Sequence, residues 1–528
     1  MITPNFQTLA LPVDRNKNTN NLLQKIDLLR QEASQKLQQS QRGEKGQFLT
    51  PFSVAMIMAR MFEFNCPDIS LLDAGAGIGS LLAAVVCELC QRPKKPRSLH
   101  ITAYEIDLIL IDYLKQTLDW CSRECQSAGI SFTYEIRQLD FIQDAADMLH
   151  PNLFTQALKL EFTNAIINPP YAKINAKSHV RSLLRSIGVE TSNLYAGFIV
   201  AAAHLLKPNG ELVSITPRSF CNGLYFRDFR KVLLEMMALR QVHIFESRRL
   251  PFSDDAVLQE TMIVRAAKQT EKPDTVLINS STCAGDDIIL SHSLRYDELV
   301  NPSDSEQFIR ILPDSISQKI VEQMTEFTCT LQELSLTVST GKVVDFRVAC
   351  DLRLEPEHGT VPLIYPAHFS AGYVAYPTAT RKHQALAVTD KTAALLVPNE
   401  HYVLSKRFSS KEEKKRIVAV VWDANKINSS SVGFENHLNY FHRQGRGLDL
   451  ILARGLAIYL NSSLVDGFFR LFNGHTQVNA TDLRNLKYPS LEQLLLLGSE
   501  IGEIFPTQRE IDELVKKQLL NTINLHLN

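Results

Sequence analysis

The stretch LLDAGAGIGSLLAAV (71–85) joins an apolar strand-like run to a glycine-rich turn and an apolar helical run. Gly75, Gly77 and Gly79 allow positive φ angles and close approach of a ligand to the backbone. The helix that follows presents its free N–H groups at the same turn. This order predicts the first unit of an α/β ligand-binding fold, and dinucleotide-binding folds and simple tight turns share it.

The flanking residues extend this unit into a sheet. Strand-like runs occur at 70–75, 99–106, 132–138, 162–168, 210–217, 241–246 and 260–266, and helical stretches at 79–91, 107–127, 193–206 and 225–238. Such alternation predicts an α/β fold, a doubly wound sheet with helices on both faces. Because no clear helix separates the last two runs, we expect them to form an antiparallel hairpin at one edge.

The composition is that of an ordinary globular protein, with 45% hydrophobic and 21% charged residues among 528 and a net charge of −1. A nucleic-acid partner would therefore have to bind a local basic surface. The nine cysteines are scattered. The pairs Cys87/Cys90 and Cys121/Cys125 fall at helical spacing within predicted helices, whereas a zinc site needs two such pairs presented by turns or knuckles. Without a membrane-spanning run or a signal-peptide layout, we expect a cytoplasmic protein with reduced thiols, no membrane partner and no metal.

Changes in composition and in the pattern of apolar residues divide the chain into five parts. They are a helical arm (1–45), the α/β domain (46–270), a polar connecting region (271–330), a β-rich domain (331–490) and a helical tail (491–528). We expect the α/β domain and the β-rich domain to be the two working parts.

The segment NAIINPPYAK (164–173) ends an apolar run with Asn168, Pro169, Pro170 and Tyr171. Two prolines remove two backbone donors and fix two φ angles, and a residue that precedes proline is held extended. The result is a stiff exit from a strand that carries one amide and one ring. A purely structural Pro-Pro turn is the alternative interpretation.

Two carboxylates follow the neighbouring strands. Glu105 ends the strand after the glycine turn, where a carboxylate can accept from ribose hydroxyls. Asp140 follows the third strand, with Phe141 beside it, and could accept from an adenine amino group. Either acid could instead be a helix N-cap or a solvated loop residue.

The motifs DAGAGIGS, YEID, LDF and NPPY, in that order, resemble the S-adenosylmethionine-dependent DNA adenine-N6 methyltransferases. GQFLTPFSVAMIMARMF (46–62) ahead of the glycine turn resembles the element with which these enzymes hold the methionine end of the cofactor, and matches their gamma arrangement. The resemblance covers about residues 46–266 and implies a Rossmann-like catalytic domain. Its implied cofactor contacts are Thr50 and Pro51 to the methionine, Asp73 to its amino group, the three glycines, Glu105 to the ribose, and Ile106, Asp140 and Phe141 to the adenine.

The same resemblance implies how the target base is held. The Asn168 side-chain oxygen and the Pro169 carbonyl would accept the two hydrogens of the adenine N6 amino group, kept in place by Pro170, and Tyr171 would stack on the base. An adenine in a duplex must first be flipped out to reach such a pocket. Phe252 is the candidate for a second stacking ring, and an ordinary core phenylalanine is the alternative.

The β-rich domain carries a basic run, VLSKRFSSKEEKKR (403–416). In a methyltransferase we expect this run to contact DNA phosphates, although a charged run is also typical of a solvated face. FFRLFNGHTQVNATDLRNLKYP (468–489) resembles the end of DNA-recognition domains, and TGKVVDFR, PLIYPAHF and GHTQVNATDLR resemble modification enzymes of the PstI and BsuBI type. The DNA-binding candidates are Lys406, Arg407, Lys411, Lys414, Lys415, Arg416, His475, Thr476, Gln477 and Asn479.

These features predict a site-specific adenine-N6 methyltransferase of double-stranded DNA, the modification enzyme of a type II restriction–modification system, acting as a monomer or weak dimer. Any cognate restriction endonuclease would be a separate protein, because no Pro-Asp precedes the Glu-x-Lys of Glu413 and Lys415 at a useful spacing on a strand. An RNA or protein-glutamine N-methyltransferase, and a DNA-binding specificity subunit without activity, stay open as alternatives.

Overall fold

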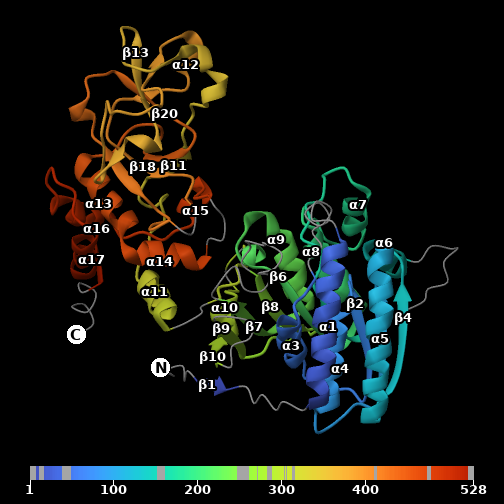
Figure 1. The fold of residues 1–528 in the computed structure, drawn as a ribbon. Coiled ribbons are helices and arrows are strands. Elements are labelled where there is room, and N and C mark those ends of the chain that lie inside the picture. The colour runs from blue at the N-terminus through green and yellow to red at the C-terminus, as the bar shows by residue number, and fades with distance from the viewer. Residues whose placement is uncertain are drawn as a thin grey trace, which may run out of the picture. The chain divides into compact units, whose positions relative to one another are not determined.

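The protein divides into two compact units, residues 1–313 and 314–528, in a computed structural model (Figure 1). The structure describes residues 7–10, 17–37, 49–150, 161–245, 261–269, 271–281, 288–302, 304, 306–311, 315–409, 413–472 and 477–520. Each unit has its own sheets and its own hydrophobic core.

The first unit is built on a ten-stranded sheet. Its strands lie in the order β1 (Gln7–Ala10), β10 (Ile288–Arg295), β9 (Thr275–Ser281), β7 (Ala238–Phe245), β8 (Thr261–Ala267), β6 (Leu206–Pro217), β5 (Phe162–Ile167), β2 (Asp68–Ala74), β3 (Ser98–Tyr104) and β4 (Ser131–Arg137). The five strands from β6 to β4 are parallel, and β8 inserts antiparallel between β6 and β7. All seven predicted strands are therefore present.

The expected hairpin of β7 and β8 forms, but it does not lie at an edge. β9 pairs in parallel with β7, and β10 and β1 extend the sheet beyond it. The polar residues between these strands hid two strands from the sequence pattern, so part of the predicted connecting region, 271–330, belongs to this sheet.

Two groups of helices pack with the sheet (Figure 1). One group comprises α1 (Lys17–Lys36), α3 (Phe52–Arg60), α4 (Ser80–Gln91) and α5 (Leu108–Ala128); the other comprises α6 (Phe141–Leu149), α7 (His179–Ser186), α8 (Leu194–Leu205) and α9 (Arg227–Met236). The predicted N-terminal arm is not a free arm, because α1 packs on α4 and α5 and buries Leu22, Ile26 and Leu29 in the core.

The second unit contains two small sheets. One has the order β11 (Thr337–Thr340), β21 (Leu438–His442), β18 (Tyr402–Lys406), β19 (Ala419–Trp422), β15 (Tyr373–Val374) and β14 (Phe369–Ser370); the other has the order β12 (Leu352–Arg353), β16 (Ala385–Ala387), β13 (Thr360–Ile364), β20 (Ser431–Phe434) and β17 (Val397–Pro398). These strands are short and separated by irregular turns, as the sequence predicts for the β-rich domain.

Helices complete the core of this unit. α13 (Leu450–Asn461) packs on α16 (Leu491–Ser499), and a side chain at Gly455 or Gly498 would overlap the backbone of the other helix. α17 (Gln508–Val515) also contacts α13. The predicted helical tail is therefore an integral layer of the second unit.

Candidate active site

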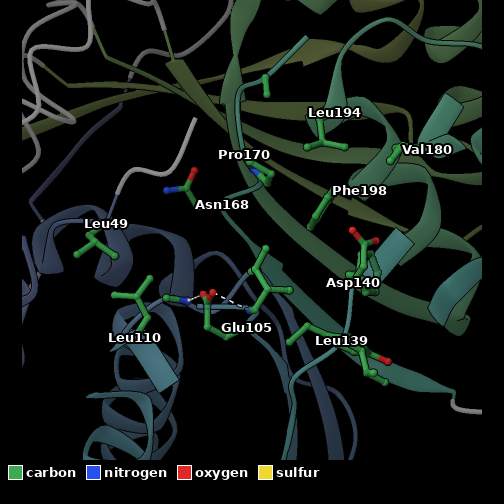
Figure 2. A pocket seen from close by; sticks show the side chains of 16 residues that line it. Leu49, Glu105, Leu110, Leu139, Asp140, Asn168, Pro170, Val180, Leu194 and Phe198 are labelled. Carbon is green, nitrogen blue, oxygen red and sulfur yellow. Dashed lines mark hydrogen bonds between the residues drawn. The ribbon is translucent and has the colours of Figure 1, made fainter. Parts of the chain in front are cut away.

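A cavity of about 400 Å³ lies at the carboxyl ends of the parallel strands of the first unit (Figure 2). This edge is where open α/β sheets bind their ligands, because the connections there diverge. Its lining residues are Leu49, Gly75, Gly77, Tyr104, Glu105, Ile106, Leu110, Leu139, Asp140, Phe141, Asn168, Pro170, Ala172, Val180, Leu194 and Phe198. The structure thus brings together the glycine turn, both predicted carboxylates and the NPPY segment.

The glycine turn has the left-handed backbone that its sequence predicts, with φ of 86° at Gly75, 56° at Gly77 and 87° at Gly79. The N–H groups of Gly75 and Ala76 both donate to the carbonyl oxygen of Tyr104, at 3.0 and 2.8 Å. A Cβ at Gly79 would lie 2.9 Å from a methyl group of Leu114. The turn is therefore fixed against β3, and its backbone forms one wall of the cavity.

Glu105 is buried at the end of β3 and accepts three backbone hydrogen bonds. Its Oε2 accepts from the N–H of Gly77, and its Oε1 accepts from the N–H groups of Ile106 and Asp107, each at 2.8 Å. Burial raises the pKa of this carboxyl, and the three donors oppose that rise. Since a carboxylate has about four acceptor positions, one on Oε2 is left for a ligand.

Asp73 lies on β2, behind the glycine turn, with no exposed surface. Among the described residues neither of its carboxylate oxygens has a hydrogen-bond partner. Burial, and then the negative charge of Glu105, raise its pKa well above the ordinary value. A buried carboxyl without a partner is unfavourable by itself, and Asp73 is not among the residues that line the cavity.

The cavity wall opposite the glycine turn is formed by residues that follow β4, together with Ile106, which follows β3. Asp140 is the N-cap of α6, accepting from the N–H of Gln143 at 3.0 Å, and it also faces the cavity (Figure 2). Phe141 is buried, with its ring 5.1 Å from that of Tyr104 in an edge-to-face arrangement. Ile106 is 57% exposed at the cavity. Asp140 therefore both caps α6 and lines the cavity.

Asn168 follows β5 directly, and both ends of its amide are engaged. Its Nδ2 donates to the Thr50 hydroxyl oxygen at 2.9 Å, and its Oδ1 accepts from the Tyr171 hydroxyl at 3.0 Å. Thr50 is buried, and Pro51, the extended N-cap of α3, follows it. Thr50 therefore adjoins the amide itself, a contact that no sequence pattern indicates.

The Tyr171 ring is half-buried beside the cavity. Its hydroxyl lies 3.2 Å from the carbonyl oxygen of Ile215, a second acceptor, and its ring meets that of Tyr195 edge to face at 6.2 Å. Burial raises the pKa of the Tyr171 hydroxyl, so it stays protonated at neutral pH. Sequence reasoning missed Leu194 and Phe198, which line the cavity, and Tyr195, which packs on Tyr171. An apolar stretch of a helix does not indicate which of its side chains face a site.

A family model described as Eco57I restriction-modification methylase matches residues 99–250. The type II methyltransferase M.PstI of Providencia stuartii is 41% identical over 94% of this chain and 96% of its own length. M.BsuBI of Bacillus subtilis, also a type II methyltransferase, is 44% identical over 91% of this chain and 95% of its own length.

This chain belongs to the type II methyltransferases of restriction–modification systems. The predicted family and its DNA-methyltransferase function are thereby confirmed, with S-adenosylmethionine as the cofactor. The solved structure of the type IIL restriction-modification enzyme MmeI in complex with DNA has the same fold, with a TM-score of 0.50, 12% identity, and coverage of 94% of this methyltransferase and 75% of MmeI.

In the second unit of this methyltransferase the predicted basic run contains both exposed and buried cations. Lys406 and Arg407 are half-buried and Lys414 is exposed. Lys415 instead donates from Nζ to the carbonyl oxygen of Asn461 at 2.7 Å, and Arg416 is fully buried.

The inward position of Lys415 and Arg416 corrects their prediction as DNA contacts. Asp466 accepts from the backbone N–H of Arg416 at 2.6 Å, and the guanidinium of Arg416 lies over the Phe469 ring at 5.7 Å. Burial lowers the pKa of Lys415. These contacts hold the segment against the core, so Lys415 and Arg416 stabilise the fold of this unit.

Gln477 is half-buried and its backbone pairs with that of Phe408, and Asn479 is the N-cap of α15 (Ala480–Arg484). The predicted residues Phe252, Lys411, His475 and Thr476 lie outside the described residues. Within the described ranges, no group of three or more His, Cys, Asp and Glu side chains is arranged to hold a metal ion. No described helix is long and apolar enough to cross a membrane.

Proposed function

We propose that this methyltransferase transfers a methyl group to the N6 atom of an adenine flipped out of double-stranded DNA. The observation that carries the proposal is the Asn168 amide, which stands at the cavity on a stiff Pro-Pro segment with its Nδ2 occupied by Thr50. Its Oδ1 accepts from the Tyr171 hydroxyl, and would accept from a substrate amino group once that hydroxyl turns to the Ile215 carbonyl.

The residues that line the cavity, together with Asp73 behind the glycine turn, suit S-adenosylmethionine. Asp73 is a buried carboxyl without a partner among the described residues, which complements the ammonium group of the methionine part. Glu105 keeps one acceptor position for a ribose hydroxyl, and Ile106 and Phe141 offer apolar surface for the adenine ring. When bound, the cofactor supplies a methyl group that is electrophilic because its sulfur carries a positive charge.

The chain itself has to activate the adenine amino group, a weak nucleophile because its lone pair is delocalised into the ring. Two acceptors, Asn168 Oδ1 and the carbonyl oxygen of Pro169, would hold its two hydrogens and favour a pyramidal nitrogen whose lone pair is free. The prolines fix the backbone, so little reorganisation is needed during the reaction. Pro170 lines the cavity next to this pair.

Aromatic rings would stabilise the extrahelical base. Tyr171 stacks on it in this proposal, and Tyr195 supports Tyr171 from the side through the edge-to-face contact. The Tyr171 hydroxyl has two acceptors within reach, Asn168 Oδ1 and the Ile215 carbonyl, so it can leave Asn168 when a substrate amino group arrives. Phe252 is the proposed second stacking ring.

Double-stranded DNA is the proposed partner, since the chain belongs to the methyltransferases of restriction–modification systems. We further propose that the second unit recognises the target sequence, that the protein acts as a monomer or weak dimer, and that any cognate endonuclease is a separate protein.

A label-transfer assay tests the proposed function. The protein is incubated with tritiated S-adenosylmethionine and, in separate reactions, plasmid DNA, total RNA and a protein extract. Label in DNA is expected, and it should disappear in Asn168→Ala while the affinity for the cofactor changes only a few-fold. Label confined to RNA or protein would overturn the substrate, and cofactor binding without any label in DNA would indicate a recognition subunit.

A further inference from the structure

Three loops of the second unit meet in one exposed surface. We define the 341–347 face by six residues: Lys342, Phe346 and Arg347 from the loop after β11, Lys406 and Phe408 from the end of β18, and His437 from the turn between β20 and β21. Among these six residues the sequence pattern indicated DNA contact only for Lys406.

Backbone contacts hold the three loops together. The N–H of Asn436 donates to the Val343 carbonyl oxygen at 2.8 Å, and the N–H of Arg407 donates to the His437 carbonyl oxygen at 2.8 Å. A side chain at Gly341 would overlap the carbonyl oxygens of Phe434 and Glu435. The loop after β11 therefore needs glycine in order to lie against the turn, and the face is built as one piece.

The short helical turn Asp345–Arg347 presents an aromatic ring to solvent. Asp345 Oδ1 accepts from the Tyr365 hydroxyl at 2.9 Å, while Val343 and Val348 on either side are buried. Phe346, between these anchors, is 79% exposed. Its backbone is thus held firmly while its ring extends into solvent, where a partner can cover it.

A second ring and a surplus of positive charge lie on the same face. Phe408 is 43% exposed and its ring lies 4.9 Å from that of His437. The exposed cations are Lys342 and Arg347, with Lys406 half-buried beside them. Against these three cations stand Glu435, which is buried and contacts His437, and Asp345, which accepts from the Tyr365 hydroxyl. The face therefore presents net positive charge around two apolar rings.

We propose that the 341–347 face is a contact surface for double-stranded DNA, in which Lys342 and Arg347 bind phosphates and Phe346 inserts between bases. Lys and Arg supply most of the affinity for a phosphate backbone, and exposed apolar wedges open base steps in bent or kinked duplexes. The Arg347 guanidinium lies over the Phe346 ring at 5.6 Å, so charge and wedge act at one place. This inference rests on the proposed function, which requires DNA as the substrate.

The phosphate part is tested with a fluorescent 40-bp duplex of mixed sequence and the full chain. Lys342→Gln/Arg347→Gln should lower affinity about tenfold near physiological salt and reduce the slope of log affinity against log salt by about two. Lys391→Gln, on the exposed face of α12 (Asp390–Ala393), is the matched control and should leave both unchanged. Equal slopes for the double variant and the wild type would overturn this part.

The wedge part is tested by methylation of plasmid DNA. Phe346→Ala should lower the rate about tenfold, since stacking on a base contributes about 1–3 kcal/mol, while Phe346→Trp keeps most of it. Ile504→Ala, which truncates another highly exposed apolar residue, is the control and should be neutral. An unaltered rate for Phe346→Ala would overturn the wedge.

The outcomes separate this inference from the proposed function. A wild-type protein that methylates no DNA refutes the proposed function. A wild-type protein that methylates DNA while the variants of the face bind and react normally refutes only the face, and it points to a protein partner for those rings. Unchanged cofactor affinity in every variant confirms that the catalytic unit is folded.

Discussion

The cavity of the first unit and the 341–347 face of the second unit use polar groups in opposite ways. In the cavity Glu105 and Asn168 are tied to backbone or side-chain partners: Glu105 keeps one acceptor position on Oε2, and Asn168 Oδ1 accepts from the Tyr171 hydroxyl. On the face Lys342 and Arg347 stay exposed to solvent. The cavity is thus suited to chemistry that needs fixed geometry, and the face to binding that needs charge.

This difference makes distinct predictions. Changes in the cavity should alter the rate of methyl transfer or the affinity for the cofactor even when DNA is saturating. Changes on the face should alter the affinity for DNA and its dependence on salt.

The largest effect is expected at Asn168. Asn168→Ala removes the acceptor proposed for the N6 amino group, and single-turnover methylation at saturating DNA and cofactor should fall by a factor of about 10²–10³. Asn168→Asp keeps an acceptor but adds a charge, so it should retain more activity than alanine. Near-normal turnover in the alanine variant would contradict the mechanism.

Asp73 is expected to show opposite effects on stability and binding. Because its folded-state pKa is raised, its contribution to stability is greatest at low pH and is lost as pH rises through that pKa. Asp73→Asn should therefore unfold at a temperature close to that of the wild type at pH 5, and at a higher temperature at pH 8.

The same variant should bind S-adenosylmethionine at least about tenfold more weakly, since a hydrogen bond to a charged group contributes about 1.5–3 kcal/mol. Thermal unfolding at both pH values and cofactor titration by calorimetry check the pair of effects. Lower stability together with unchanged affinity would show that Asp73 has a structural partner instead of a ligand.

Thr50 separates orientation from cofactor binding. Thr50→Val removes the acceptor for Asn168 Nδ2 while keeping the shape of the side chain, so the rate at saturating cofactor should fall about tenfold, the equivalent of one hydrogen bond. Thr50→Ser should restore most of it. If valine instead weakens cofactor binding and leaves the saturated rate unchanged, Thr50 is a cofactor contact only.

The smallest effects are expected in the basic run, where two adjacent lysines differ. Lys414→Gln removes an exposed cation and should weaken duplex binding two- to threefold, with a shallower salt dependence. Lys415→Gln removes the hydrogen bond to Asn461 and should lower the thermal midpoint without changing the salt dependence. The reverse pattern would mean that the segment turns outward when DNA binds.

The seven strands from β2 to β8 and the helices α4, α5, α8 and α9 could be predicted because their apolar periodicity is strong and their glycine turn has one compatible backbone. The cavity was predictable for a related reason: Glu105, Asp140 and Asn168 each follow a parallel strand, and such strand ends meet at one edge.

Other features were beyond sequence reasoning. A contact between residues far apart in the chain leaves no local sequence pattern. Thr50 and Asn168, for example, are separated by 118 residues. Charge alone also does not indicate burial. Arg416 belongs to the same basic run as the exposed Lys414, yet it is buried against Asp466 and Phe469. The position of β9 and β10 depends on pairing that polar loops conceal.

The central claim is that the NPPY segment grips the amino group of adenine. Mass spectrometry of nucleosides from plasmid DNA methylated by the purified protein tests it most directly. The account predicts N6-methyladenine as the modified nucleoside, absent after reaction with Asn168→Ala. A methylated cytosine in its place would contradict it.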